Sequence, residues 1–319
     1  MKLAVFKENG TDRVAISTKD SERVFLDVNA LAEPLKQCGF ELTTDVTALI
    51  ASFSNTNPPC ADLEPLISRF SRDQSHSQAR LDIENLKLEA PIRRPGKIIC
   101  LAGNYREHIV ESGFVAPAES ATFTQQLFLK PATSIIGDRD DIMIGNNNET
   151  VGWETELAVI IGKPGRNIEP ANAYDHIFGY TILNDVSERR LNSGIANRTK
   201  REMDGFFDWL AGKWFDGFAP CGPWIVTADD IEDPHNLEIK LTVNGQVRQQ
   251  GNTGDMIFRI PDQIAYISSI MTIEPGDIIS TGTPVGAGVG GVAALQDGDE
   301  MVCEIEGIGT LRNKVRAGN

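Results

Sequence analysis

The sequence predicts an α+β protein in which a mixed, folded β-sheet forms most of the core, preceded by a small N-terminal α/β domain. Short segments rich in β-branched and aromatic residues outnumber helical segments along the 319-residue chain. These segments do not alternate regularly with helices, as they would in a doubly wound sheet. A hydrophobic content of 41% is enough to build a large buried core.

The first part of the chain begins with strands and continues with helices. Interrupted β-rich segments predict strands at residues 2–6, 13–17 and 24–27. Apolar periodicity predicts helices at residues 45–53 and 62–70. We therefore expect a small α/β unit at the N-terminus.

A break in regular structure is predicted near residue 90. The run APIRRPG at residues 90–96 contains two prolines and a glycine, which commonly interrupt helices and strands. We place a domain boundary there and divide the chain into a small N-terminal domain, residues 1–90, and a larger domain, residues 91–319, which contains the candidate catalytic residues described below.

Strands dominate the larger domain. Its apolar segments, many of them separated by glycine-containing turns, predict strands at residues 97–101, 127–130, 156–162, 179–184, 224–227, 237–243, 277–281 and 300–305. Helices are predicted at residues 171–176 and 261–271. The polar segment at residues 192–213 carries an aromatic patch and fits either a helix or an ordered loop.

Composition narrows the range of functions. Acidic residues exceed basic ones by 45 to 30, so the basic surface of a nucleic-acid-binding protein is missing. No apolar run reaches the roughly 20 residues of a membrane span. The N-terminus does not resemble a signal peptide, and we expect a cytoplasmic protein. Five scattered cysteines favour neither a zinc cluster nor a disulfide framework.

Three carboxylates form a candidate metal site. Glu154 and Glu156 stand two apart at the start of an apolar strand, so their side chains share one face. Asp185 follows a second apolar strand. Three convergent carboxylates suit a hard cation such as Mg²⁺ or Mn²⁺. Spacing alone leaves open the alternative of a surface strand end and an ordinary turn.

Four further residues are candidates for acid–base chemistry or anion binding. His108 and Glu111 are three apart, and one helical turn would bring their side chains together. An exposed surface turn is the alternative. Lys213 is either a solvated charge or an electrostatic stabiliser beside a bound cation. Arg106 is a candidate for carboxylate binding through its bidentate guanidinium.

The turn STGTP at residues 280–284 is a candidate ligand contact. Gly282 would let the backbone approach a ligand closely, and Thr283 adds a hydroxyl. Amides and hydroxyls in such a turn can hold a carboxylate. A simple tight turn is the alternative.

Several motifs in one order resemble the fumarylacetoacetate hydrolase family. They include GWETEL at 152–157, NDVSER at 184–189, GKWFDGF at 212–218 and STGTP at 280–284. The resemblance covers most of the chain after residue 95. It implies a mixed β-sandwich roll, the family's C-terminal domain fold, and a homodimer. It also implies one Mg²⁺ or Mn²⁺ per subunit, held by Glu154, Glu156 and Asp185.

The resemblance also implies roles for the other candidates. His108 would be the general base with Glu111 as its partner on a short lid, and Lys213 would stabilise an enolate or fix a substrate carboxylate. Thr283, beside Gly282, would contact substrate. Animal fumarylacetoacetases carry another acidic ligand seven positions before the histidine, where this chain has Leu101. The chain therefore resembles the shorter bacterial members more closely.

The activity implied by the resemblance is metal-dependent hydrolysis of a C–C bond in a small 1,3-diketo or 2-oxo acid, such as an acylpyruvate. The same enolate chemistry supports decarboxylation of an oxaloacetate-like acid. It also supports isomerisation or hydration of an unsaturated 2-oxo diacid in aromatic catabolism. A non-catalytic protein that binds metal and acid is a further alternative. The expected partner is a small acid, with no nucleic acid and no membrane.

Overall fold

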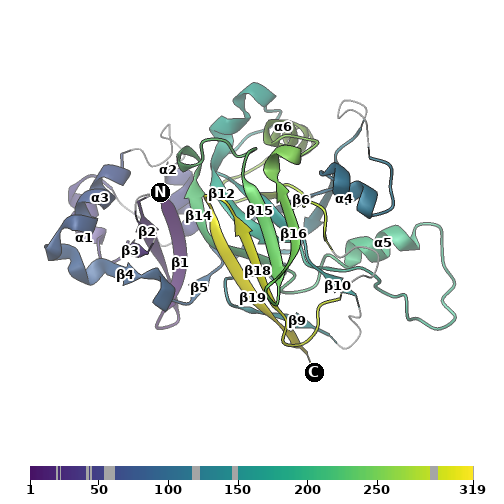
Figure 1. Cartoon of the computed structure of the whole chain (residues 1–319). Helices are drawn as coiled ribbons and strands as arrows, with labels where there is room; N and C mark the ends of the chain where they lie inside the picture. Colours follow the sequence, from purple (N-terminus) through teal and green to yellow (C-terminus); the bar gives the residue numbers. More distant parts are fainter. Residues whose placement is uncertain are drawn as a thin grey trace.

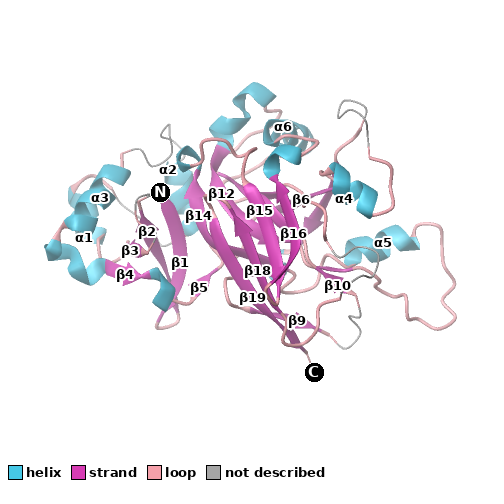
Figure 2. Cartoon of the chain, viewed as in Figure 1, coloured by secondary structure: helices cyan, strands magenta, loops and turns pink. Residues whose placement is uncertain are grey.

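The computed structural model describes residues 1–18, 21, 23–40, 43, 45–53, 62–116, 123–145, 150–287 and 294–318. Strands make up the centre of the molecule, and helices lie around it (Figure 2). This arrangement confirms the predicted α+β class with a mixed, folded sheet. Among the described helices, none has the length and apolar character needed to cross a membrane.

The larger sheet extends from the N-terminal region through the centre of the molecule (Figure 1). Its strands follow the order β4-β3-β2-β1-β14-β12-β11-β17-β6-β7, while β5 pairs with β1 and β8 with β14. Most pairs are antiparallel, but β17 and β6 run parallel. The strands are β1 Lys2–Glu8, β2 Thr11–Ser17, β3 Val24–Asp27, β4 Arg80–Asp82, β5 Leu88–Glu89, β6 Ile98–Ala102, β7 Gln126–Lys130, β8 Ile135–Ile136, β11 Thr155–Ile161, β12 Ile177–Asn184, β14 Ala219–Thr227 and β17 Ile278–Ser280.

A second sheet packs on the centre of the first and completes a sandwich. Its strands follow the order β16-β15-β18-β19-β9. Val159 and Ile182 of the larger sheet share one apolar cluster with Ile239 and Leu241 of the second. The strands are β9 Asp141–Ile144, β15 Glu238–Val243, β16 Gln246–Asn252, β18 Glu300–Ile305 and β19 Gly309–Ala317, and β10 Val151–Gly152 pairs separately with β13 Ser187–Glu188.

Helices cover the other face of the larger sheet and the ends of the sandwich. Leu49 and Ile67, from two N-terminal helices, share a second apolar cluster with Ile160 and Ile225. The α-helices are α1 Ala32–Gln37, α2 Val46–Phe53, α3 Glu64–Arg72, α4 Arg106–Glu111, α5 Asp204–Ala211 and α6 Ile260–Ile270. The 3₁₀ helices are η1 Gln74–Ala79, η2 Ile83–Asn85, η4 Ala132–Ser134, η5 Pro170–His176, η6 Ala228–Asp230 and η7 Thr253–Asp255.

β11 is buried on both faces, which explains its continuous apolar run. Leu157 and Val159 point into the sandwich, whereas Ala158 and Ile160 belong to the cluster on the opposite face. Because side chains alternate along a strand, Glu156 lies on the same side as Ala158. The alternation therefore directs this carboxylate away from the second sheet.

Most predicted elements coincide with observed ones within a few residues, with differences at identifiable places. The predicted strand at 224–227 begins earlier, at Ala219, although Pro220 and Pro223 interrupt its sequence. Residues 170–176 form a 3₁₀ helix instead of an α-helix. The undecided segment at 192–213 contains α5. β1 pairs with both β2 and β14, so one sheet spans residue 90, and the domain division there stays a prediction.

Candidate metal centre and active site

Strand pairing brings the three candidate metal ligands together. β11 and β12 are antiparallel neighbours, with Thr155 opposite Asn184. Glu154, immediately before β11, therefore lies beside Asp185, immediately after β12. The Asp185 amide donates a hydrogen bond of 2.8 Å to the Glu154 carbonyl oxygen. Glu156 projects from the same face of β11 two residues further on.

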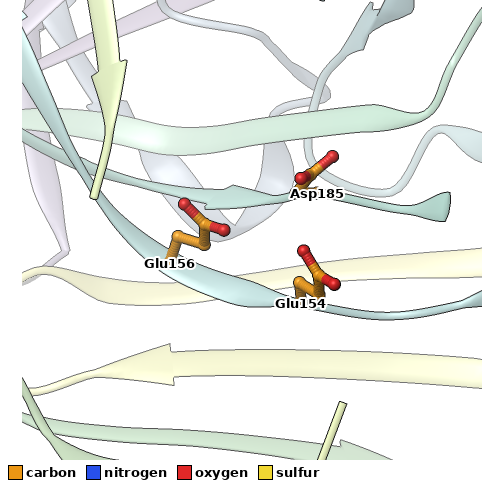
Figure 3. A group of neighbouring side chains, drawn as sticks. All are labelled: Glu154, Glu156 and Asp185. Carbon is orange, nitrogen blue, oxygen red and sulfur yellow. The ribbon is translucent and has the colours of Figure 1, made fainter. Parts of the chain in front are cut away.

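The carboxylates of Glu154, Glu156 and Asp185 form one buried cluster (Figure 3). One oxygen from each lies within 4.8 Å of the others. The three residues are at most 5% exposed, so water screens them little. Three like charges in such a place require nearby positive charge.

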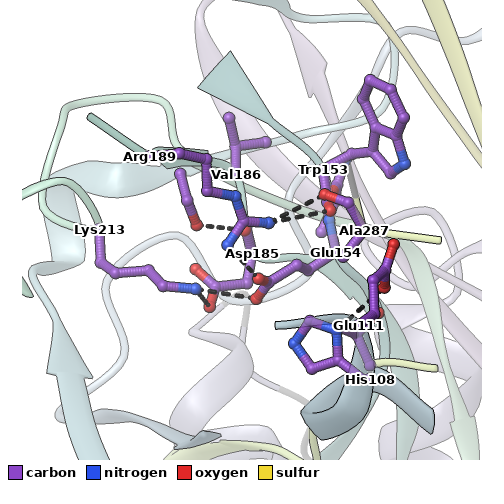
Figure 4. Close-up of polar contacts among 12 residues, drawn as sticks. His108, Glu111, Trp153, Glu154, Asp185, Val186, Arg189, Lys213 and Ala287 are labelled. Atoms are coloured by element: carbon purple, nitrogen blue, oxygen red, sulfur yellow. Dashed lines mark hydrogen bonds and ion pairs between the residues drawn. The ribbon is translucent and has the colours of Figure 1, made fainter. Parts of the chain in front are cut away.

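Three cationic side chains contact two of these carboxylates, and two of the three, Lys213 and Arg189, are labelled in Figure 4. The Lys213 ammonium lies 2.8 Å from Glu154 Oε2 and 2.7 Å from Asp185 Oδ2. Lys130 donates to Asp185 Oδ1 at 2.6 Å, and Arg189 donates to Glu154 Oε1 at 2.5 Å. Lys213 therefore bridges the two acids from the side of the cavity, while Lys130 and Arg189 hold their other oxygens.

These contacts decide which groups are charged. Burial would raise the pKa of Glu154, but Arg189 and Lys213 outweigh it and hold that pKa far below its ordinary value. Burial would lower the pKa of Lys213, but Asp185 and Glu154 raise it more. Lys213 is therefore an ammonium ion that can stabilise negative charge, and it is unsuited to act as a base.

Glu156 differs because no ion pair reaches it from any described residue. Its Oε2 accepts hydrogen bonds from Ser280 Oγ at 2.6 Å and from the Gly282 amide at 2.7 Å. Burial, with Asp185 and Glu154 nearby, raises the pKa of Glu156 well above its usual range. A buried carboxylate beside two others, without its own cation, suits a divalent metal ion.

The predicted base and its partner lie on α4, whose residues follow β6. His108 Nδ1 lies 3.6 Å from Glu111 Oε2, an ion-pair distance (Figure 4). Glu111 Oε2 also accepts a hydrogen bond of 2.9 Å from the Gly286 amide. Burial alone would raise the pKa of Glu111. His108 and the Gly286 amide outweigh this effect, so the pKa of Glu111 lies below its usual value. The Glu111 carboxylate therefore faces Nδ1 of the imidazole across 3.6 Å, and its hydrogen bond from Gly286 ties α4 to the turn after β17.

The other predicted contact residues have different positions. Arg106 is exposed on α4 and does not line the cavity described below. The Gly282 amide is bonded to Glu156, and Thr283 Oγ1 donates to the Thr155 carbonyl oxygen at 2.8 Å. Gly282 has φ +94°, and a Cβ there would lie 2.7 Å from the Asn104 Cβ. The turn therefore requires glycine at position 282, and its hydrogen bonds position Glu156 and the start of β11. Direct substrate contact by Gly282 and Thr283 stays a prediction.

Lys130 and Arg189 are site residues that sequence reasoning missed. Lys130 is fully buried at the end of β7, in the run FLKP. A lysine in an apolar strand was the available signal, because such a residue must meet a buried acid. Arg189 follows Asp185 by four residues, but nothing in that spacing indicates a bond to Glu154.

A cavity of about 1340 Å³ opens onto these groups. Glu154, Glu156 and Lys213 line its inner end, together with His108 and Thr283. Two of the predicted metal ligands, Glu154 and Glu156, therefore face one space with the predicted base and the predicted stabilising lysine, while Asp185 contacts that lysine at 2.7 Å. This geometry suits the binding of a small anion that can chelate a cation.

The family model "Fumarylacetoacetate (FAA) hydrolase C-terminal" matches residues 97–316. The oxaloacetate tautomerase FAHD2A of Homo sapiens mitochondria is 42% identical over 228 residues, which cover 71% of this chain and 68% of that protein.

Two solved structures extend the likeness to the whole chain. Fumarylacetoacetate hydrolase from Exiguobacterium antarcticum has a TM-score of 0.76 and 32% identity. Maleylpyruvate hydrolase from Sphingobium sp. SYK-6, in complex with manganese(II) and pyruvate, has a TM-score of 0.73 and 29% identity. In both cases 100% of each chain is covered. This chain therefore belongs to the fumarylacetoacetate hydrolase family.

Proposed function

We propose that this protein is a metal-dependent hydrolase that cleaves a C–C bond in an acylpyruvate-like 2,4-dioxo acid, with Mg²⁺ or Mn²⁺ as cofactor. The observation that carries the proposal is the placement of His108, with Glu111 behind it, in the cavity that Lys213, Glu154 and Glu156 also line. A base for water and a cation for an enolate thus share one space.

Glu154, Glu156 and Asp185 would hold the metal ion. A divalent ion bound there supplies electrophilic stabilisation of developing negative charge on oxygen. The Lys213 ammonium, kept charged by Glu154 and Asp185, adds a second positive charge for the enolate oxygen. Lys130 and Arg189 keep the carboxylates oriented.

His108 would begin the reaction by removing a proton from water. Its Nδ1 faces Glu111, so Nε2 is the nitrogen that can accept the proton. The hydroxide oxygen adds to the acyl carbon, and the bond between that carbon and the methylene carbon breaks. The electron pair stays on the methylene carbon as an enolate. Protonation of that carbon gives pyruvate, and the acyl group leaves as a carboxylic acid.

Keto–enol tautomerisation of an oxaloacetate-like acid is the second candidate. The 42% identity to a human oxaloacetate tautomerase favours it. The reaction needs only a proton transfer at the carbon next to the 2-oxo group and stabilisation of the enolate. His108 and Lys213 are suited to these two tasks as well. Decarboxylation or isomerisation would use the same enolate.

A turnover screen with product identification tests the proposal. Purified protein with Mn²⁺ is given acylpyruvates and oxaloacetate, with and without a chelator. We expect acylpyruvates to yield pyruvate and a carboxylic acid in equal amounts, and the chelator to abolish this. Loss of the enol absorbance without cleavage products would instead establish the tautomerase. Absence of turnover with every compound would favour a binding protein.

A further inference from the structure

The outer part of the active-site cavity is much more apolar than a small diacid requires. Its volume of about 1340 Å³ exceeds the roughly 300–1,000 Å³ of most ligand pockets. Aromatic side chains of β7 and α5 line this part, namely Phe128, Phe206 and Trp209. The space beyond the carboxylates is therefore large and apolar.

These three rings form a continuous surface. Phe128 and Trp209 pack edge to face with their centroids 5.3 Å apart. Phe206, three residues before Trp209 on α5, lies 6.0 Å from it in a tilted arrangement. Residues three apart share one face of a helix, so α5 presents Phe206 and Trp209 together.

The aromatic surface begins next to the reacting groups. The Lys213 ammonium lies 5.1 Å from the Phe128 centroid and 5.6 Å from the Trp209 centroid. These distances fall within the roughly 6 Å of a cation–π contact. If the enolate oxygen of a substrate contacts Lys213, the acyl group of that substrate would therefore lie beside these two rings.

Among the residues that the structure describes, few cations lining this cavity are available to a second substrate carboxylate. Lys213 and Arg189 line the cavity, but both are bonded to the metal-site carboxylates. Arg190 also lines the cavity and is exposed, so it is the alternative docking point for a distal carboxylate. The surface next to Lys213 itself is aromatic.

We infer that the acyl group of the substrate is apolar and flat, such as an aryl group, and that it binds on Phe128 and Trp209. This inference rests on the proposed function and specifies the substrate class for the same site. Flat apolar groups stack on aromatic rings and gain from leaving water. A terminal carboxylate would lose its hydration there, and the cation beside these rings, Lys213, is already paired with Glu154 and Asp185.

The test compares acylpyruvates that carry a methyl, a phenyl or a carboxylate-bearing acyl group, with saturating Mn²⁺. For wild type we expect kcat/KM to be about 10-fold or more higher for phenyl than for methyl. In Trp209→Ala that ratio should fall towards one. If the substitution also loosens Lys213, kcat/KM should fall for both substrates alike. The ratio therefore measures the contribution of the aromatic subsite alone.

Two variants serve as controls. Phe207→Ala removes a neighbouring ring of α5 that is 56% exposed and does not line the cavity, so the ratio should stay at the wild-type value. Trp209→Phe keeps an aromatic ring and should retain most of the preference. If Trp209→Ala does not fold, Phe206→Ala replaces it, with a smaller expected fall in the ratio.

A wild-type ratio near one, a preference for the carboxylate-bearing substrate, or an unchanged ratio in Trp209→Ala would overturn the inference. If none of the acylpyruvates is turned over, the proposed hydrolase fails, but the subsite is still tested by binding. Calorimetry would then compare a 2-oxo acid carrying a phenyl group with one carrying a methyl group. Equal affinities would overturn the subsite independently.

Discussion

The position of the Lys213 side chain affects metal binding as well as the proposed reaction. Its ammonium bridges Glu154 and Asp185, two of the three proposed metal ligands. A divalent ion that binds these acids must share them with Lys213 or displace it. The lysine would therefore oppose metal binding, while in the proposed reaction it would stabilise the enolate.

Replacing Lys213 should separate these two effects. In Lys213→Met we expect kcat to fall about 10²–10³-fold, because one stabilising charge is lost. Mn²⁺ affinity should be retained or increased, because two buried carboxylates lose their shared cation. Calorimetry and steady-state kinetics measure the two quantities. Lys163→Met, at an exposed lysine, is the control. Weaker Mn²⁺ binding in Lys213→Met would contradict this account.

His108 is assigned to proton transfer, and its replacement should affect rate more than binding. We expect His108→Asn to lower kcat by about 10²–10⁴-fold. KM should change little, because the imidazole is not a metal ligand here. Glu107→Gln, on the exposed side of α4, is the control. A variant that kept wild-type kcat would remove His108 from the mechanism.

The sequence predicted the acidic part of the site better than the basic part. Glu154 and Glu156 were found because strand alternation is a local rule. Asp185 lies beside the two glutamates because it follows the strand that pairs with β11. Lys130 and Arg189 were missed because their bonds to Asp185 and Glu154 span 55 and 35 residues. Such pairings depend on the tertiary fold, which local spacing does not reveal.

At the scale of elements, α4 depends on its surroundings. Helices shorter than about 12 residues are rarely stable alone, and α4 has six residues. The Glu111 carboxylate accepts a hydrogen bond from Gly286, and Ile109 is buried beneath the helix. These contacts set where His108 stands relative to the cavity.

Removing the Glu111 contact should loosen α4. In Glu111→Ala we expect faster amide hydrogen exchange across residues 106–112 and a higher KM, because the Gly286 amide loses its partner. Mass spectrometry after deuterium exchange measures the first effect. Glu107→Ala, on the same helix, should leave the exchange unchanged. Equal protection in the two variants would show that Glu111 does not hold the helix.

The pairing of β12 with β14 requires a residue without a side chain at position 179. A Cβ on Gly179 would lie 2.2 Å from the Val226 carbonyl oxygen. Gly179→Ala should therefore reduce the free energy of unfolding by about 1–3 kcal/mol, the usual range for overpacking. Gly194→Ala is the matched control, since its Cβ would meet nothing within 4 Å. Denaturant unfolding of both variants checks this, and equal stabilities would refute the need for glycine at this close approach of the two strands.

Strand boundaries were predictable where an apolar run ends at a turn, as at β12 and β18. β19 was missed because its sequence, GTLRNKVRA, carries charged residues on its exposed side. Its alternating burial becomes visible only when β18 and β9 pair with it. The beginning of β14 was hidden by Pro220 and Pro223, which usually mark the end of a strand.

At the scale of the whole molecule, the fold concentrates distant parts of the chain at one end of the larger sheet. β6, β7, β11, β12 and β17 are neighbours there, and Glu156 lies on one of them, Glu154 and Asp185 lie directly beside them in the sequence, and Lys213 comes from the segment after α5. The chain has a net charge of −15, so an anionic substrate meets unfavourable long-range potential. A bound divalent cation beside Lys213 would supply the local attraction that the net charge opposes.

The central claim is that Glu154, Glu156 and Asp185 bind one divalent ion, and Mn²⁺ titration by calorimetry tests it most directly. We expect one Mn²⁺ per wild-type chain. Glu156→Gln, which replaces a carboxylate by an amide of similar size, should weaken binding by at least about 100-fold. Asp216→Asn, at an exposed acid near Lys213, should bind as wild type does. Wild-type affinity in Glu156→Gln would contradict the account.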